Sequence, residues 1–336
     1  QNINFGRRNS IITFKEKFIR LGIPFLIGIP LIVPLLAYPK YEHFIQPGIG
    51  YLDFWYLFLT ERIQAGPNWV MYAIFLYSAV MVLAYKAIRP VFNLMACFVT
   101  WATRNPVPGF ITVGAISATI LGISDLIWGA PWWMGKWVFH LQSSRFILVA
   151  FFFTLGAAFA QAGLADNKKF MEAFSDKWIL WVGLVALFGI PYMWYSTTFY
   201  HEGAFNEDIR IFFSRGGSWG PEAWDIIFDA APPILIRTTM HGFMCLSQAL
   251  ALLAVFYKFV ATPTPMWTSL ARNCYGIFII HEAVMVWSQY MLTGSGLPIP
   301  LKFAFVFIVG LSVAWTVNDK VLLKIPLVKR VLSPNG

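Results

Sequence analysis

Two cations, Lys17 and Arg20, lie three residues apart where a polar lead-in meets an apolar segment. Residues three apart on a helix share one face, so both side chains can hold one anion at the membrane surface. The alternative is that they anchor the helix by reaching lipid headgroups. Their spacing therefore suggests a site for an anionic substrate and leaves a plain interfacial role open.

His281 lies near the middle of the apolar stretch 273–292. An ionisable group at that depth is costly in lipid and is expected to face the bundle interior or a wet cavity. It could act as a base, line a site, or make a structural hydrogen bond between helices. The adjacent Glu282 points about 100° away on a helix, so the two do not form a simple dyad.

Arg237 and His241 begin a polar stripe on another apolar stretch, 232–257, and Cys245 and Gln248 continue it. The spacing places all four on a narrow arc of one helix, which is expected to face inward. Arg237 and His241 lie near the outer end, where they could meet an acceptor substrate or close a channel. Interhelical hydrogen bonding to groups such as Gln161 is the alternative.

The composition indicates the class of protein in which these residues lie. Hydrophobic residues make up 58% of the 336 residues and charged ones 12%, and the mean hydropathy is +0.63. These values predict an all-α, polytopic membrane protein. The three cysteines have no metal-ligand spacing, so no metal site is expected.

Eight apolar runs are long enough to span a hydrocarbon core of about 30 Å. They cover residues 21–38, 67–85, 106–124, 145–163, 178–195, 232–257, 273–292 and 299–317. With both ends in the cytoplasm, most of the 25 Lys and Arg residues fall on inner segments, such as the connection that carries Lys86 and Arg89. Positive-inside bias therefore explains the formal charge of +9, and the expected partner is the lipid bilayer, not nucleic acid.

A single integral domain over 1–336 is expected, with a cytoplasmic lead-in at 1–20 and the largest outer loop at about 196–231. No extramembrane stretch is long enough to build a core of its own. The chain opens without Met on a basic segment, from which we expect an N-terminal truncation.

Three segments, in order, resemble membrane acyltransferase family 3, whose members acylate sugars and other hydroxylated acceptors. Lys17-Phe-Ile-Arg20-Leu-Gly-Ile-Pro24-Phe25 resembles the family's Arg-x-x-Arg-Leu-x-x-Pro-Phe segment, with Lys in place of the first Arg. Gly66-Pro67-Asn68-Trp69 resembles the segment whose Trp begins the following helix. Asn273-Cys-Tyr275-Gly276-Ile-Phe-Ile-Ile-His281 resembles a late Ser-Tyr-Gly-Ile-Tyr-x-x-His helix.

The resemblance implies about ten core helices, of which this chain holds about eight. In the family the first helix carries an Arg and a His implicated in catalysis, so the catalytic histidine is expected upstream of this chain. Lys17 and Arg20 become the implied donor-binding residues, although Lys17 lacks the planar fork of Arg. Trp69, His281, Arg237 and His241 become candidates for lining the site.

The implied activity is O-acyl transfer in a bacterial inner membrane, by an enzyme that moves acyl groups other than amino-acyl groups. Acyl-CoA from the cytoplasm is the expected co-substrate, with no bound cofactor, and a carbohydrate hydroxyl, on the periplasmic side, is the expected acceptor. The first segment most resembles the branch that succinylates osmoregulated periplasmic glucans. A transporter or exporter is the alternative, suggested by proline-interrupted helices and polar residues at the midplane, although the chain shows no internal repeat.

Overall fold

The computed structural model describes residues 10–128, 133–134, 139, 141–198, 221–260 and 264–332. These residues form two compact units. The described residues of unit 1 fall within Ala84–Met134 and Gln142–Thr262, and those of unit 2 mainly within Arg8–Leu83 and Pro263–Gly336. The prediction of a single integral domain is not decided by this division and stays a prediction.

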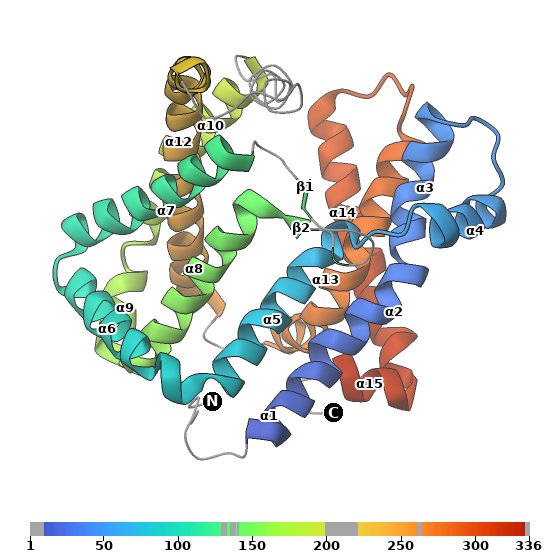
Figure 1. The fold of residues 1–336 in the computed structure, drawn as a ribbon. Coiled ribbons are helices and arrows are strands. Elements are labelled where there is room, and N and C mark those ends of the chain that lie inside the picture. Colours follow the sequence, from blue (N-terminus) through green and yellow to red (C-terminus); the bar gives the residue numbers. More distant parts are fainter. Residues whose placement is uncertain are drawn as a thin grey trace. The chain divides into compact units, whose positions relative to one another are not determined.

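Unit 2 combines the beginning and the end of the described chain. Its elements are α1 (Ser10–Lys17), η1 (Phe18–Gly22), α2 (Ile23–Leu31), α3 (Val33–Phe44), α4 (Tyr51–Glu61), η2 (Gly66–Asn68), α5 (Trp69–Leu83), α13 (Pro265–Met291), α14 (Ile299–Lys320), η4 (Leu322–Lys324) and α15 (Pro326–Leu332). Figure 1 shows α1, α2 and α3 as a nearly continuous blue run. Helices α13 and α14 pack along each other, and α3 packs on α13.

The backbone of the first run is irregular at two places. Phe18–Gly22 is a π-helical turn, and a break near Ile32 separates α2 from α3. Pro30 and Pro34 flank that break, and each lacks the N–H that would bond to the preceding turn. The chain therefore bends and widens within one apolar run that the sequence presents as a single helix.

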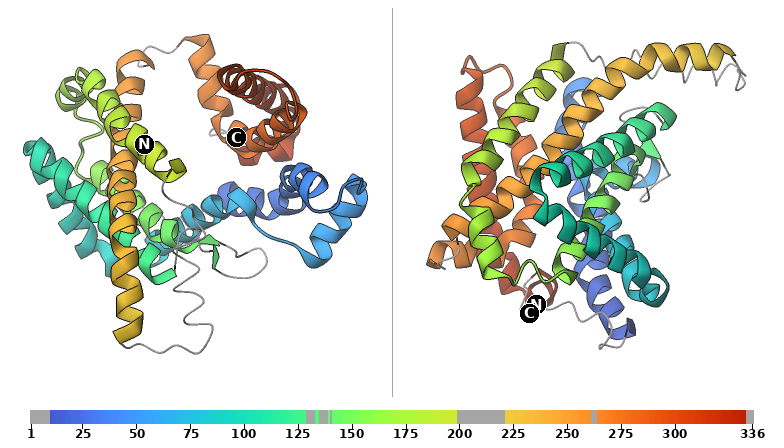
Figure 2. Two further views of the ribbon diagram at one scale, coloured as in Figure 1. Left: turned by 90° about the horizontal axis from the view of Figure 1, so that it is seen from above. Right: turned by 90° about the vertical axis from the view of Figure 1, so that its left-hand side faces the viewer.

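Unit 1 is a helical bundle. Its elements are α6 (Tyr85–Arg104), α7 (Pro106–Trp128), β1 (Trp133–Met134), α8 (Ser143–Gln161), α9 (Lys168–Ser175), α10 (Trp178–Thr198) and α12 (Pro221–Val260), and it includes Gln142 of the short strand β2 (Leu141–Gln142). The two strands pair with each other. The long helix α12 packs against both α7 and α10, as Figure 2 shows.

A glycine allows α7 and α12 to approach closely. A Cβ added at Gly242 would lie 2.6 Å from the backbone nitrogen of Ala118, a distance that real Cβ atoms do not show. Small residues at such crossings let helix backbones meet in membrane proteins. This crossing sets the register between α7 and α12, which determines the side chains that meet further along the two helices.

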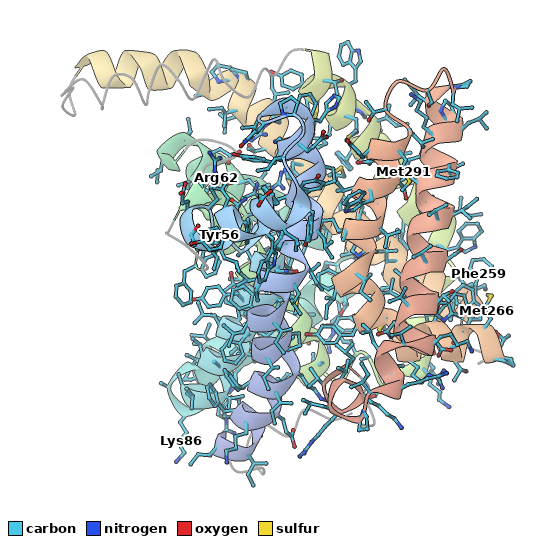
Figure 3. All side chains as sticks on the ribbon, turned by 90° about the vertical axis from the view of Figure 1, so that its right-hand side faces the viewer. Tyr56, Arg62, Lys86, Phe259, Met266 and Met291 are labelled. Carbon is cyan, nitrogen blue, oxygen red and sulfur yellow. The ribbon has the colours of Figure 1, made fainter. Side chains whose placement is uncertain are left out.

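Among the residues that the structure describes, seven helical segments are long and apolar enough to cross a membrane, which agrees with the predicted all-α, polytopic class. They are Ile11–Phe44, Gly66–Leu83, Pro106–Ile127, Ser143–Gln161, Trp178–Thr197, Ala231–Val260 and Ile299–Lys324. The predicted eighth span, 273–292, is also helical but lies in α13, which is not among the seven. Large apolar side chains project from the helices, including Phe259, Met266 and Met291 (Figure 3), as lipid contact requires.

Two boundaries differ from the sequence prediction. The connection that carries Lys86 and Arg89 is the 20-residue helix α6. It was overlooked because a search for continuous apolar runs does not detect an amphipathic helix. The outer loop predicted at 196–231 is also too long, since α12 already begins at Pro221; residues 199–220 lie outside the described part of the chain.

The predicted lead-in at 1–20 is partly helical. Its described residues form α1 and the first three residues of η1.

Candidate functional site

The first and third motif segments meet in unit 2. The Tyr275 hydroxyl of α13 donates a hydrogen bond to the backbone carbonyl of Arg20 in η1. Beside this bond, Ile19 and Tyr275 pack against a buried cluster that contains Met71 of α5 and Ile279 of α13. Segments that are far apart in the sequence thus form one local assembly.

The predicted cation pair lies at the π-helical turn of this assembly. Lys17 ends α1 and is partly buried, whereas Arg20 lies inside η1 and is exposed. The prediction of a regular α-helical face differs from the structure here, because a π turn advances less per residue and separates the two side chains further around the axis. Single π turns within α-helices are frequent at functional sites.

The second motif segment docks on α2. Gly66 adopts a φ of +52°, which opens the 3₁₀ turn η2, and Asn68 is buried beside Gly28. A Cβ at Gly28 would lie 3.1 Å from the Asn68 Nδ2. Trp69, the predicted first residue of the helix, does begin α5 and is only 6% exposed. Trp69 thus packs in the interior of unit 2.

The third motif segment also fixes α13 to α14. Asn318 Nδ2 donates to Asn273 Oδ1 at 2.7 Å, and both side chains are fully buried. Asn273 Nδ2 in turn donates to the Ser269 carbonyl at 2.8 Å and approaches the Asp319 carboxylate at 3.2 Å. The sequence analysis missed Asn318 and Asp319. The pattern that could have identified them is two adjacent polar residues at the end of an otherwise apolar run.

The contacts of His281 indicate which ring nitrogen carries its proton. Its Nδ1 lies 3.1 Å from the Ile277 carbonyl and 2.8 Å from the Phe278 carbonyl, both on its own helix. Carbonyl oxygens only accept hydrogen bonds, so Nδ1 must carry the proton. A neutral His281 therefore keeps its lone pair on Nε2, the nitrogen that could accept a proton from another group.

The other two predicted residues lie in unit 1. Arg237 pairs with Asp125 of α7 through its guanidinium, and both side chains are buried. The His241 ring lies 4.8 Å, between ring centroids, from Tyr192 of α10. Asp125 was missed, although it is the single charged residue of α7, which is the sequence signal that could have found it.

The predicted polar stripe is only partly correct. Arg237 is buried and His241 and Cys245 are partly buried, but Gln248 is exposed. The proposed partner Gln161 instead donates from Nε2 to Asn93 Oδ1 at 2.7 Å. The stripe therefore turns away from the interior before it reaches Gln248.

The candidates form two groups. Lys17, Arg20, Trp69 and His281 belong to unit 2, and Arg237 and His241 belong to unit 1. Among the described residues, no group of three His, Cys, Asp or Glu side chains could hold a metal ion.

Comparison with known proteins identifies a family. The family model for acyltransferase family 3, described as an acyltransferase domain, matches residues 3–319 and so includes segments of both units. No curated protein and no solved structure matches the chain.

Proposed function

The chain belongs to acyltransferase family 3, whose domain covers nearly its whole length, and from that premise we propose that it transfers an acyl group from cytoplasmic acyl-CoA to a carbohydrate hydroxyl. The proposal places it in a bacterial inner membrane with its acceptor on the periplasmic side. The family match supports a multi-pass membrane acyltransferase. The donor, the acceptor and the membrane are our inference.

The observation that carries the proposal is the junction of Tyr275 with Arg20. It joins the segment with the two cations to the segment with His281, within one unit. Arg20 is exposed, so its guanidinium can meet a phosphate, and Lys17 adds a second positive charge. Charge-assisted contacts to phosphate are stronger than neutral hydrogen bonds.

Further cations accompany this junction. Helix α15 packs on η1, and its last turn carries Lys329 and Arg330, both exposed. The phosphates of acyl-CoA carry several negative charges, so a basic surface formed from two elements suits this donor. By the distribution of Lys and Arg, this end of unit 2 faces the cytoplasm.

The proposed chemistry is a direct acyl transfer. The acceptor hydroxyl oxygen attacks the thioester carbonyl carbon while a base takes the hydroxyl proton. The C–S bond then breaks, and the base returns the proton to the sulfur, so that CoA leaves as its thiol. Hydrogen-bond donors must stabilise the oxyanion that forms in between. His281, with its lone pair on Nε2, is proposed to line this site.

Equilibrium binding of labelled acyl-CoA to the purified protein tests the donor site. We expect Arg20→Ala to weaken binding roughly tenfold to a hundredfold, because a hydrogen bond to a charged group contributes about 1.5–3 kcal/mol. Arg89→Ala is the matched control, since Arg89 is an exposed arginine of α6 in the other unit. Equal binding by both variants would reduce Arg20 to a lipid anchor, and binding of no acyl-CoA at all would favour an exporter.

A further inference from the structure

The buried ion pair of unit 1 takes no part in the donor site. Asp125 and Arg237 leave only 2% and 5% of their side chains exposed. Burying two charges costs more than their attraction returns unless further hydrogen bonds satisfy them, and apolar replacements often serve stability as well. Stability alone therefore gives a weak reason for this pair, and ionisable groups within membrane segments commonly mark functional sites.

One oxygen of the pair is left unsatisfied. Asp125 Oδ2 accepts from Arg237, whereas Asp125 Oδ1 is buried without a hydrogen-bond partner among the described residues. A buried carboxylate oxygen without a donor costs free energy. A ligand hydroxyl that donates to Oδ1 would remove that cost.

The neighbouring groups suit a ligand rich in hydroxyls. The Ser144 hydroxyl is within hydrogen-bonding range of the Asp125 carboxylate without satisfying Oδ1, and Arg145 acts electrostatically on the carboxylate from an exposed position. His241 lies one turn further along α12, and its ring lies near that of Tyr192 of α10. Carboxylate, guanidinium and hydroxyl groups can bond to sugar hydroxyls, and ring faces can pack against sugar C–H bonds.

The position along the helices indicates the side from which a ligand would come. Asp125 lies near the end of α7, Ser144 and Arg145 lie in the first turn of α8, and Arg237 lies early in the apolar part of α12. With the cytoplasmic assignment of both chain ends, these three places all lie toward the outer side.

We propose that the centre formed by Asp125, Ser144, Arg145, Arg237 and His241 binds the carbohydrate acceptor from the outer side. In this arrangement Asp125 Oδ1 accepts a hydrogen bond from an acceptor hydroxyl. This inference rests on the proposed transferase function, because it assigns the acceptor of that reaction to unit 1. It gives Arg237 and His241 a role in binding without a role in donor recognition.

The test uses the full chain and a paired substitution. Asp125→Asn alone would leave Arg237 buried without its counter-charge, so Asp125→Asn is combined with Arg237→Gln, a neutral pair that can still form a hydrogen bond. The matched control is Asp176→Asn combined with Lys258→Gln, which neutralises an exposed ion pair that also involves α12. The probe is cellotetraose, with tetraethylene glycol as a ligand without sugar hydroxyls, and labelled acyl-CoA is measured on the same samples.

We expect the parent protein and the control to bind cellotetraose saturably, and the paired variant to bind it at least about tenfold more weakly. Acyl-CoA binding should stay unchanged in all three. Equal cellotetraose binding by the paired variant, or no saturable binding by the parent, overturns the acceptor site. Absence of acyl-CoA binding by the parent protein would instead count against the proposed function. Failure of the acceptor site and failure of the proposed function are therefore distinguishable.

Discussion

The two units place polar groups in different ways. In unit 2 the first two motif segments include irregular backbone, the π turn η1 and the 3₁₀ turn η2, and the Arg20 side chain reaches the surface. In unit 1 the polar centre lies between regular helices, and its two charges are buried against each other. An exposed cation at an irregular turn suits the reversible binding of an anion. A buried ion pair with an unsatisfied carboxylate oxygen suits the binding of a ligand hydroxyl.

The difference also separates two kinds of ion pair. Asp125–Arg237 is buried, whereas Arg272–Asp319 in unit 2 and Lys258–Asp176 in unit 1 are largely exposed on at least one partner. Only the first should be sensitive to the loss of one partner, since solvent screens exposed pairs. Substitutions can therefore test the contrast directly.

The largest effect is expected from Asp125→Asn as a single substitution. It removes the carboxylate charge that pairs with the buried Arg237 guanidinium, and breaking a buried ion pair costs about 3–5 kcal/mol. The yield of monodisperse protein and its Tm in detergent should fall sharply. Asp176→Asn, on the exposed pair, should change stability by about 1 kcal/mol or less, and equal losses would contradict the contrast.

The next largest effect is expected at Gly276 of α13. An added Cβ would lie 2.6 Å from the Asn318 Nδ2, so Gly276→Ala should destabilise unit 2 by about 1–3 kcal/mol through overpacking. Gly156→Ala is the control, because nothing lies near a Cβ there and alanine favours a helix by about 1 kcal/mol. Thermal unfolding should shift in opposite directions for the two variants.

Tyr275→Phe should have a smaller and more selective effect. It removes the hydroxyl that binds the Arg20 carbonyl, a loss of about 0.5–1.5 kcal/mol. We expect the KM for acyl-CoA to rise several-fold with less change in kcat, because the substitution displaces the turn that is proposed to bind the donor. Tyr56→Phe, at an exposed tyrosine of α4, should leave both constants unchanged, and a loss of kcat alone for Tyr275→Phe would contradict a positioning role.

The smallest effect concerns salt. Raising the ionic strength shortens the Debye length from about 10 Å at 0.1 M to about 3 Å at 1 M. Binding of acyl-CoA at exposed cations should weaken progressively over this range, whereas binding of cellotetraose, an uncharged ligand, should hardly change. Parallel loss of both would indicate that salt acts on the fold and not on the donor site.

The sequence predicted much of the helical framework. Each of the eight apolar runs lies in helical segments, because length and hydropathy are local properties of the chain. The order of the three motif segments pointed to the family, and the structure brings the first and third segments into direct contact. Local pattern and family resemblance were sufficient for these features.

The missed features depend on partners in space. Arg237 was identified from its spacing to His241, but its partner Asp125 comes from a helix 112 positions away in the sequence. The π turn was missed because Phe18–Gly22 has the same apolar pattern as an α-helix. Asn318 was overlooked because its role is to bond to Asn273 of another helix. The pattern of a single helix does not reveal such a bond.

The most direct test compares acyl-CoA binding by two variants with that by the parent protein. Labelled acetyl-CoA and succinyl-CoA are titrated into Arg20→Ala and into the paired variant of Asp125→Asn with Arg237→Gln, each beside the parent protein. We predict that Arg20→Ala binds the donor at least about tenfold more weakly and that the paired variant binds it as the parent does. Unchanged donor binding by Arg20→Ala, or its loss in the paired variant, would contradict the assignment of the donor site to unit 2.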